Sequence, residues 1–287
     1  MVHGVAISSD RLQSSARAAR KFLESCNYPL GVALIDHLLF AGPGWEVINA
    51  LRPFQNADGG FGRSLEVDIA APNSNPFATR LAMIALLQVQ DGNAQELLPS
   101  LQRWLVANQA EDGDWHLSNG TRAGKLAPWF AAWTHPSLNP ACCVTGFAHR
   151  LGIATVDMLD RTAGLFDALA SVEQVTNGTF YDLLPYSEYL TAVDNVPQQE
   201  AYLDAFAARI TSAADEVYED AAHFWDQVLA LGIPLTERLS QNMLATWAER
   251  LLAEQSSDGG WTTPYDPAWR PWATTGAVIV LAHLARS

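Results

Sequence analysis

Gln-Asn-Ala-Asp-Gly-Gly-Phe, residues 55–61, is the stretch that decides the fold. It combines a helix end, an Asp-Gly turn and an aromatic ring beyond the turn. Asp-Gly and Asn-Gly pairs turn the chain tightly because they tolerate positive φ. The Gln amide can hydrogen-bond the exposed backbone groups of this turn or of the next one. The ring, three residues after the Asp, can pack back beneath the turn.

The same pattern occurs four times in the chain. Each copy reads Gln, two residues, Asp or Asn, Gly, one residue and an aromatic residue. The copies lie at residues 55–61, 109–115, 174–180 and 255–261, and the third is the weakest. Internal repetition predicts a repeating architecture. We expect the repeat rings Trp115 and Trp261 to be buried plugs of their turns, and all four copies can be purely structural.

This repeat resembles the glutamine–tryptophan repeat of the squalene–hopene cyclase and terpene cyclase superfamily. Its Asp-Gly-Gly-Phe form is also similar to the repeat of protein prenyltransferase β-subunits. The first copy continues with Gly-Arg-Ser-Leu-Glu-Val-Asp at 62–68 and Asn-Pro-Phe-Ala-Thr at 75–79. That longer string resembles bacterial prenyltransferase or squalene-oxidase repeat proteins. The resemblance covers residues 45–287 and implies an α/α toroid around a central apolar cavity.

Helical patterns run through the chain, and convincing strands are absent from the sequence. Asp10 is the expected N-cap of a helix that ends near Cys26, and Pro76 begins another in its first turn. Apolar periodicity predicts further helices at 29–40, 44–54, 94–108, 123–134, 139–151, 155–172, 181–193, 199–231, 234–254 and 270–284. About twelve helices fit an all-α, single α/α toroid of about six hairpins. Its inner ring is expected to comprise 76–89, 139–151, 181–193 and 271–284.

Domain organisation follows from composition. No linker rich in Ser, Gly or Pro divides the 287 residues, so we expect one domain at 10–287 after a flexible tail at 1–9. The acidic residues between 200 and 220 are expected to form a solvated outer face.

Charge and apolar content limit the partners and the compartment. The formal charge is −14, with 31 acidic and 17 basic residues, so neither nucleic acid nor an anionic membrane is an expected partner. The sequence has no secretory signal and no apolar run of the ~20 residues that stable membrane insertion requires. Three cysteines are an odd number that predicts no disulfide framework, and we expect a cytoplasmic protein.

Candidate catalytic acids are sought where terpene cyclases carry theirs. In that family, the middle Asp of an Asp-any-Asp-Asp-Thr string initiates cyclisation at the head of an inner helix. Residues 75–79 keep the Thr of this string and lack its acids. The remaining acids near the same rim are Asp68, Glu66 and Asp182. A carboxyl buried in an apolar cavity has a raised pKa and can act as a general acid. Alternatively, Glu66 and Asp68 are loop residues that pair with Arg63 or Arg80.

The resemblance implies a hydrophobic, isoprenoid-like or polyene-like substrate and a proton-initiated cyclisation or rearrangement. Aromatic faces stabilise the cations of such a reaction. The candidate substrate-binding residues are Trp129, Trp133, Tyr181, Tyr186, Trp269 and Trp272. Core packing is the alternative for each of them.

No metal and no cofactor is expected. Cys142, Cys143 and His149 share a predicted helix, but Cys143 and His149 are six residues apart and face different directions. The Asp-any-Cys element of the protein prenyltransferases is missing. A nucleophilic triad, a phosphate loop and a dinucleotide fingerprint are also absent from the sequence. The isolated histidines are expected to be satisfied surface or core residues; they are His116, His135, His223 and His283.

Two other functions stay open at this point. The first is a non-catalytic α/α toroid that binds a hydrophobic ligand or a partner protein. The second is a carbohydrate-active lyase or hydrolase on an α/α barrel, which needs paired carboxylates and aromatic platforms. Likeness of fold does not decide among the three functions.

Overall fold

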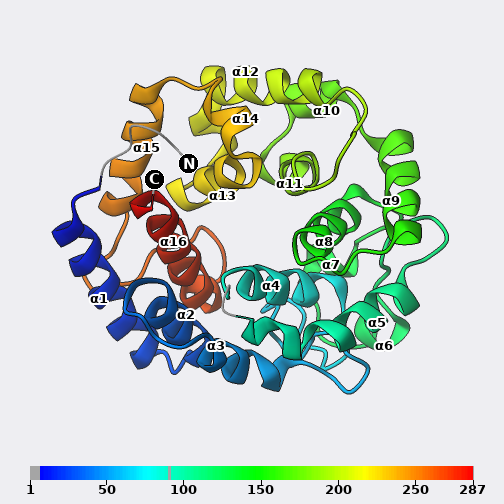
Figure 1. Ribbon diagram of the computed structural model, residues 1–287, viewed down its shortest axis with the longest axis horizontal. Coiled ribbons are helices and arrows are strands. Elements are labelled where there is room, and N and C mark those ends of the chain that lie inside the picture. The colour runs from blue at the N-terminus through cyan, green and yellow to red at the C-terminus, as the bar shows by residue number, and fades with distance from the viewer. Residues whose placement is uncertain (1–6, 90–91, 287) are drawn as a thin grey trace. The chain divides into compact units, whose positions relative to one another are not determined.

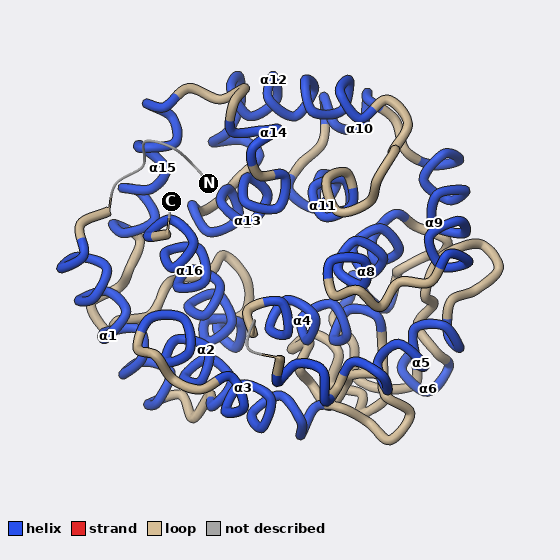
Figure 2. Tube along the Cα trace, viewed as in Figure 1, coloured by secondary structure: helices blue, strands red, loops and turns tan. Residues whose placement is uncertain are grey.

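The computed structural model describes residues 7–89 and 92–286, which form helices joined by turns (Figure 2). This part of the chain contains 16 α-helices and three 3-10 helices. Its only β pairings are isolated bridges. The all-α class is therefore confirmed. No helix among the described residues combines the length and the apolar character needed to cross a bilayer.

The chain is divided into two compact units. Unit 1 comprises Met1–Pro43, Val172–Leu183 and Gln198–Ser287, and unit 2 comprises Gly44–Ser171 and Leu184–Pro197. Helix α11 (Phe180–Tyr189) contributes residues to both units. The toroid and the single domain at 10–287 stay predictions. So does the tail at 1–9, of which residues 1–6 lie outside the described residues.

Unit 1 contains a group of three mutually packed helices, α1 (Ser9–Ser25), α2 (Pro29–Leu39) and α16 (Arg270–Ala285) (Figure 1). The N-cap of α1 is Ser8, whose side chain accepts a hydrogen bond from the Arg11 N–H, so the expected Asp10 cap is wrong by two residues. The other helical elements of unit 1 are α10 (Val172–Asn177), α12 (Gln199–Val217), α13 (Ala221–Leu231), α14 (Ile233–Thr236), α15 (Gln241–Ala253) and η3 (Pro267–Trp269).

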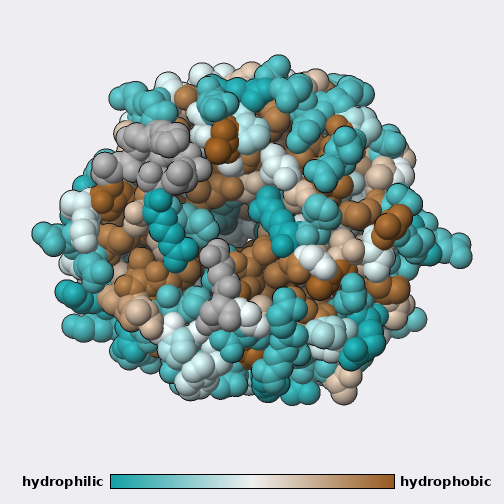
Figure 3. All heavy atoms as spheres, in the orientation of Figure 1, coloured by the Kyte–Doolittle hydropathy of each residue, from teal (hydrophilic) through white to brown (hydrophobic). Residues whose placement is uncertain are grey.

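The helical stretch expected at 199–231, straight or kinked, is not one continuous helix. It is two helices, because Asp220 lies outside the helix and caps α13 by accepting from the His223 N–H. The acids of α12 are exposed as expected; they include Glu200, Asp204, Asp215 and Glu216. Figure 3 shows hydrophilic side chains over α12 at the top of the view.

Unit 2 begins with α3 (Gly44–Leu51) and η1 (Arg52–Phe54), which end at the first repeat. Helix α4 (Pro76–Leu87) packs on α8 (Leu138–Arg150), which packs on α9 (Val156–Leu169). The remaining elements are η2 (Asn93–Glu96), α5 (Leu98–Asn108), α6 (Asn119–Arg122) and α7 (Pro128–Ala131).

The helix expected at 123–134 is wrong, because α6 ends at Arg122 and only the single-turn helix α7 forms within this range. The segment between them pairs with the loop that precedes α4. The Ala70 N–H donates to the Lys125 carbonyl at 3.0 Å, and the Ala127 N–H donates to the Asp68 carbonyl at 2.9 Å. These bonds use backbone groups that a continuous helix would need for its own ladder.

Three of the four repeats share one local structure. In each of them the Gln side-chain Nε2 donates to the carbonyl of the turn Gly, with lengths of 3.0 Å for Gln55–Gly59, 3.1 Å for Gln109–Gly113 and 2.8 Å for Gln255–Gly259. The same amide also reaches the helix that follows or adjoins the turn, at Ser100 of α5, Thr162 of α9 and Ser15 of α1. Each Gln therefore fastens its own turn to a neighbouring helix.

The repeat rings are buried beneath these turns, as expected. Phe61, Trp115 and Trp261 are at most 2% exposed. The two indoles each donate Nε1–H to a carbonyl ten residues earlier in the chain. The bond from Trp115 to Leu105 is 2.9 Å and that from Trp261 to Leu251 is 2.8 Å.

The turn glycines have positive φ, at +97° for Gly59, +89° for Gly113 and +93° for Gly259. They also touch the backbone of the adjoining helix. A Cβ atom would lie 2.1 Å from the Ser100 carbonyl oxygen at Gly59 and 2.3 Å from that of Ala18 at Gly259. Glycine is thus required both by conformation and by the approach of the helix.

The turn expected at the third repeat is wrong. Residues 174–177 belong to α10, and Gly178 is not among the glycines with positive φ. Phe180 instead begins α11. The start of that helix is capped by Asp182, which accepts from both the N–H and the hydroxyl of Thr179. The local Asn-Gly sequence is therefore used as a short link between two helices.

Replacing Gly259 with Ala is expected to lower the free energy of unfolding by at least about 2 kcal/mol, because positive φ costs about 1–2 kcal/mol and overpacking about 1–3 kcal/mol. Gly152→Ala is the matched control. Gly152 has a φ of +71°, but no atom lies within 4 Å of the position that a Cβ would take there. Gly152→Ala should therefore lose only the conformational cost of about 1–2 kcal/mol. Urea unfolding measures both values, and equal losses would contradict the docking of the turn on α1.

Candidate functional site

The loop before α4 carries two of the expected acids, Glu66 and Asp68, within unit 2. Glu66 is only 6% exposed, and Leu65 and Ile69 of the same loop are buried as well. Glu66 Oε1 accepts a hydrogen bond from the Asp68 N–H at 3.2 Å. An isolated bridge between Ile69 and Leu126 holds the loop in place. Glu66 is therefore a core residue and not a solvated loop residue.

The environment keeps a proton on Glu66. Burial raises the pKa of its carboxyl to about 8, and the negative charge of Asp68 acts in the same direction. The hydrogen bond from the Asp68 backbone and the charge of Arg80 oppose this rise but do not cancel it. Glu66 is thus mainly neutral at pH 7, in contrast to an ordinary glutamate.

A buried ion pair lies in the same unit. Arg80 of α4 donates from Nε to Glu188 of α11 at 2.8 Å, and a second bond joins the same two side chains. Arg80 is 17% and Glu188 6% exposed. Helix α8 approaches this point closely, since a Cβ on Gly146 would lie 2.0 Å from the Glu188 carbonyl oxygen. The pair therefore joins α4 to α11, and the close approach of α11 to α8 requires glycine at position 146.

The charges of this pair do not activate the neighbouring thiol. Burial raises the pKa of Cys143 well above its usual value, and the negative charge of Glu188 adds to the rise. A thiol of this kind is protonated and inert. Arg63, the other arginine considered for the loop acids, donates to Asn56 Oδ1 at 2.9 Å.

An aromatic cluster packs on the same loop. Ile69 and Ala71 share a hydrophobic core with Phe77 and Phe130, against which Trp133 is packed. Ring centroids are 4.5 Å apart for Phe77–Phe130 and 4.9 Å apart for Phe77–Trp133. Trp133 donates Nε1–H to Ser137 Oγ at 3.1 Å. Among the candidate substrate-binding aromatic residues, Trp133 thus packs on the core that contains Ile69 and Ala71 of this loop.

The other expected site residues are not members of that cluster. In unit 2, Trp129 is 52% exposed, whereas Tyr186 is 1% exposed and its hydroxyl accepts from the Ser171 N–H at 3.0 Å. In unit 1, Tyr181 is 52% exposed and Asp182 is an exposed helix cap. Trp269 and Trp272, also in unit 1, are half-buried.

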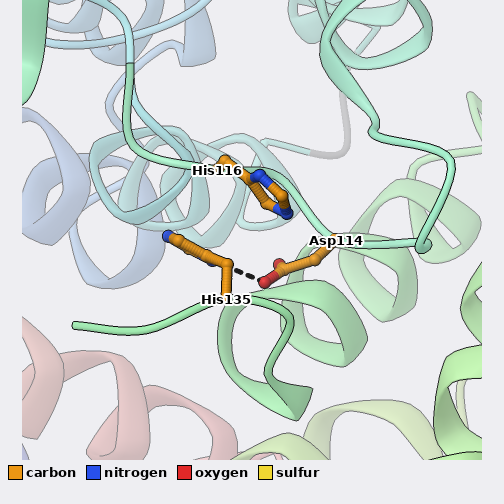
Figure 4. A group of neighbouring side chains, drawn as sticks. All are labelled: Asp114, His116 and His135. Carbon is orange, nitrogen blue, oxygen red and sulfur yellow. Dashed lines mark hydrogen bonds and ion pairs between the residues drawn. The ribbon is translucent and has the colours of Figure 1, made fainter. Parts of the chain in front are cut away.

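Sequence reasoning missed a cluster in unit 2, formed by Asp114, His116 and His135 (Figure 4). Asp114 is fully buried, and its Oδ2 lies 2.6 Å from His135 Nδ1. The two imidazole rings stack with centroids 4.6 Å apart. One signal was available in the sequence: Asp114 occupies the repeat position at which the first and fourth copies carry Gly60 and Gly260.

The hydrogen bonds of this cluster leave no lone pair on His135 for a metal. Candidate ligand atoms of the three residues lie within 4.8 Å of one another. However, the Leu117 N–H donates to His135 Nε2 at 3.2 Å, which places the imidazole proton on Nδ1. That proton is donated to Asp114 Oδ2, which also accepts from the Ser137 N–H at 3.0 Å. The arrangement therefore suits a buried structural network.

The chain matches no protein-family model, no curated protein and no solved structure. The resemblance to the terpene cyclase superfamily therefore stays an expectation based on the repeats.

Glu66→Gln is expected to change how stability depends on pH. The native state holds the Glu66 proton up to about pH 8, whereas the unfolded chain loses it near 4.5. The native state thus binds more protons between these values, and its stability falls as the pH rises through this window. Gln has no such proton. Between about pH 5.5 and about pH 8.5, the stability of the variant relative to the parent should rise by at least about 1.4 kcal/mol, the equivalent of one pKa unit.

Urea unfolding at the two pH values measures this difference. Asp182→Asn, which removes an exposed carboxyl, is the control and should show no comparable gain. A constant difference between Glu66→Gln and the parent would mean that Glu66 is ionised in the folded protein.

Metal analysis of protein purified without chelator is expected to show no stoichiometric zinc, because the His135 proton and the Leu117 N–H occupy both ring nitrogens. Inductively coupled plasma mass spectrometry makes this measurement. One equivalent of zinc that is lost in His135→Asn would overturn the tautomer assigned to His135.

Proposed function

We propose that the chain is a metal-independent acid catalyst that cyclises or rearranges an isoprenoid or another hydrophobic polyene-like substrate. Glu66 is the proton donor. The observation that carries this proposal is the buried carboxyl of Glu66, whose pKa of about 8 keeps it protonated at neutral pH. An exposed carboxyl gives its proton to water at that pH and has none to deliver.

The α/α toroid is part of this proposal. Its support is the repeated docking of Gln55, Gln109 and Gln255, each on a neighbouring helix. A chain of such contacts builds hairpins side by side. In a toroid of about six hairpins, the enclosed cavity would be the default ligand site.

The strength of the acid favours one part of the substrate class. General acids work best when their pKa is near the operating pH, and Glu66 meets this condition. An acid with a pKa of about 8 transfers a proton far more readily to oxygen than to an isolated alkene carbon. An isoprenoid with an epoxide, a carbonyl or an allylic hydroxyl is therefore the preferred substrate.

The surroundings of Glu66 suit the charges that arise during proton transfer. Deprotonation creates a carboxylate beside Asp68, and the positive charge of Arg80 offsets part of that repulsion. The faces of Phe77, Phe130 and Trp133 can stabilise a carbocation through cation–π attraction. Asp68 is the second carboxyl through which Glu66 can regain a proton.

A non-catalytic toroid that binds a hydrophobic ligand is the second candidate function. It is favoured by the hydrogen bond from the Asp68 N–H to Glu66 Oε1. In this case the neutral Glu66 only closes its loop, and no proton leaves it.

The proposal is tested by incubating the protein with two probe substrates, 2,3-epoxysqualene and geranylgeraniol. Mass spectrometry of the extracted products should show a cyclised isomer of 2,3-epoxysqualene, in which the epoxide oxygen has become a hydroxyl, or a cyclised product of geranylgeraniol that has lost one water. Glu66→Gln should lower the initial rate on the order of 100-fold or more, as expected for loss of a general acid. Asp182→Asn is the matched control and should keep the parent rate.

Full activity in Glu66→Gln would show that Glu66 is not the proton donor. Saturable binding of a probe with no turnover by the parent protein would favour the binding toroid.

A further inference from the structure

A second cluster of titratable side chains lies in unit 1, at the start of α13. Asp220 Oδ1 accepts from the His223 N–H at 2.9 Å, and its Oδ2 accepts from His223 Nδ1 at 2.8 Å. One carboxylate thus caps the helix and also orients the imidazole. The His223 side chain is 20% exposed.

The second ring nitrogen of His223 is open. Within the described part of the chain, the only side-chain hydrogen bond of His223 is the one from Nδ1 to Asp220. Nε2 is not among the buried atoms that lack a partner. This nitrogen therefore reaches the surface, where it can bond to a ligand. The carboxylate that caps α13 also bonds to Nδ1, but no contact of this kind assigns a role to Nε2.

Two aromatic residues contact the imidazole, and a third lies beside those two. The centroid of His223 lies 4.3 Å from that of Phe180 and 5.8 Å from that of Tyr265. Tyr181 completes the group, because its centroid is 5.1 Å from Phe180 and 6.1 Å from Tyr265. Tyr181 is 52% exposed and its side chain hydrogen-bonds that of Tyr265. An exposed aromatic surface therefore borders the open nitrogen.

The charges near His223 are acidic. Burial lowers the pKa of His223, but the hydrogen bond and charge of Asp220, together with Asp226 and Glu219, outweigh burial and raise it overall. Tyr265, which contacts the ring, is a neutral phenol, and burial raises its pKa further. The pKa of His223 is therefore above that of an ordinary histidine, and at pH values below it both ring nitrogens carry a proton, so that Nε2–H is a donor. The three acids disfavour a negatively charged ligand at the same place.

We propose that His223, Phe180, Tyr181 and Tyr265 form a binding site for a neutral aromatic ligand that bears a carbonyl group. The carbonyl oxygen accepts from Nε2–H of His223, and the ligand ring packs against the three aromatic side chains. Asp220 positions the imidazole and does not contact the ligand. This site lies within unit 1 and does not depend on the function proposed for Glu66.

The test compares three phenyl probes on the full chain. Acetophenone is neutral and has the carbonyl, benzoate is an anion, and phenyltrimethylammonium is a cation without an acceptor. Long-range nitrogen NMR of the histidine rings follows Nε2 of His223 during each titration. Acetophenone should shift this signal and bind at least about tenfold more tightly than either charged probe, a ratio that corresponds to about 1.4 kcal/mol.

His223→Phe keeps an aromatic ring and removes the donor, so it should weaken acetophenone binding by about tenfold, which corresponds to about 1.4 kcal/mol. His116→Phe, in unit 2, is the matched control and should bind as the parent does. Tighter binding of benzoate or of phenyltrimethylammonium than of acetophenone would overturn the proposal. An Nε2 signal that does not move with acetophenone would also overturn it, and this result needs no variant.

Acetophenone should bind equally to Glu66→Gln and to the parent. This arm separates a failure of the His223 site from a failure of the proposed acid catalyst.

Discussion

The amide of the repeat glutamine is the contact on which the rest of the structure depends. At residues 55, 109 and 255 it bonds both to the glycine of its own turn and to a neighbouring helix. The positive φ of that glycine and its missing Cβ let the turn touch the helix backbone. The ring that follows is buried beneath the turn and, when it is Trp, is tied to a carbonyl ten residues earlier. Local sequence and helix docking are therefore coupled at each copy.

That coupling explains what could be predicted from the sequence and what could not. Gln, Asp-Gly and the ring act within seven residues, so three turns, their buried rings and the all-α class could be predicted. The turn predicted for the third copy does not form because Asp182, eight residues after Gln174, caps the start of α11 instead. The helix predicted at 123–134 does not form because the backbone of this segment pairs with residues 68–70, which are distant in the sequence. Backbone pairing between distant segments produces no periodic pattern of apolar residues in the sequence.

The candidate sites show the same limit. The acids of the loop before α4 could be named from the sequence, but the burial of Glu66 depends on Ile69, Leu126 and the core around them. Asp114 and His135 are 21 residues apart, and His223 was treated as an isolated residue although Asp220 lies three positions before it. In each case the chemistry depends on which neighbour supplies a hydrogen bond. A carboxyl without a cationic partner keeps its proton, whereas a carboxylate with several donors becomes structural.

The proposed chemistry depends on Glu66 being neutral in the folded protein at neutral pH, and carbon-13 NMR of glutamate-labelled protein measures that property. Side-chain carboxyl signals are followed across a pH titration, and the spectrum of Glu66→Gln identifies the signal of Glu66. We expect one glutamate carboxyl that changes its shift with a midpoint near the pKa of about 8. A Glu66 signal that titrates with the exposed glutamates, near their ordinary pKa of about 4.3, would contradict the assignment of Glu66 as a stored proton.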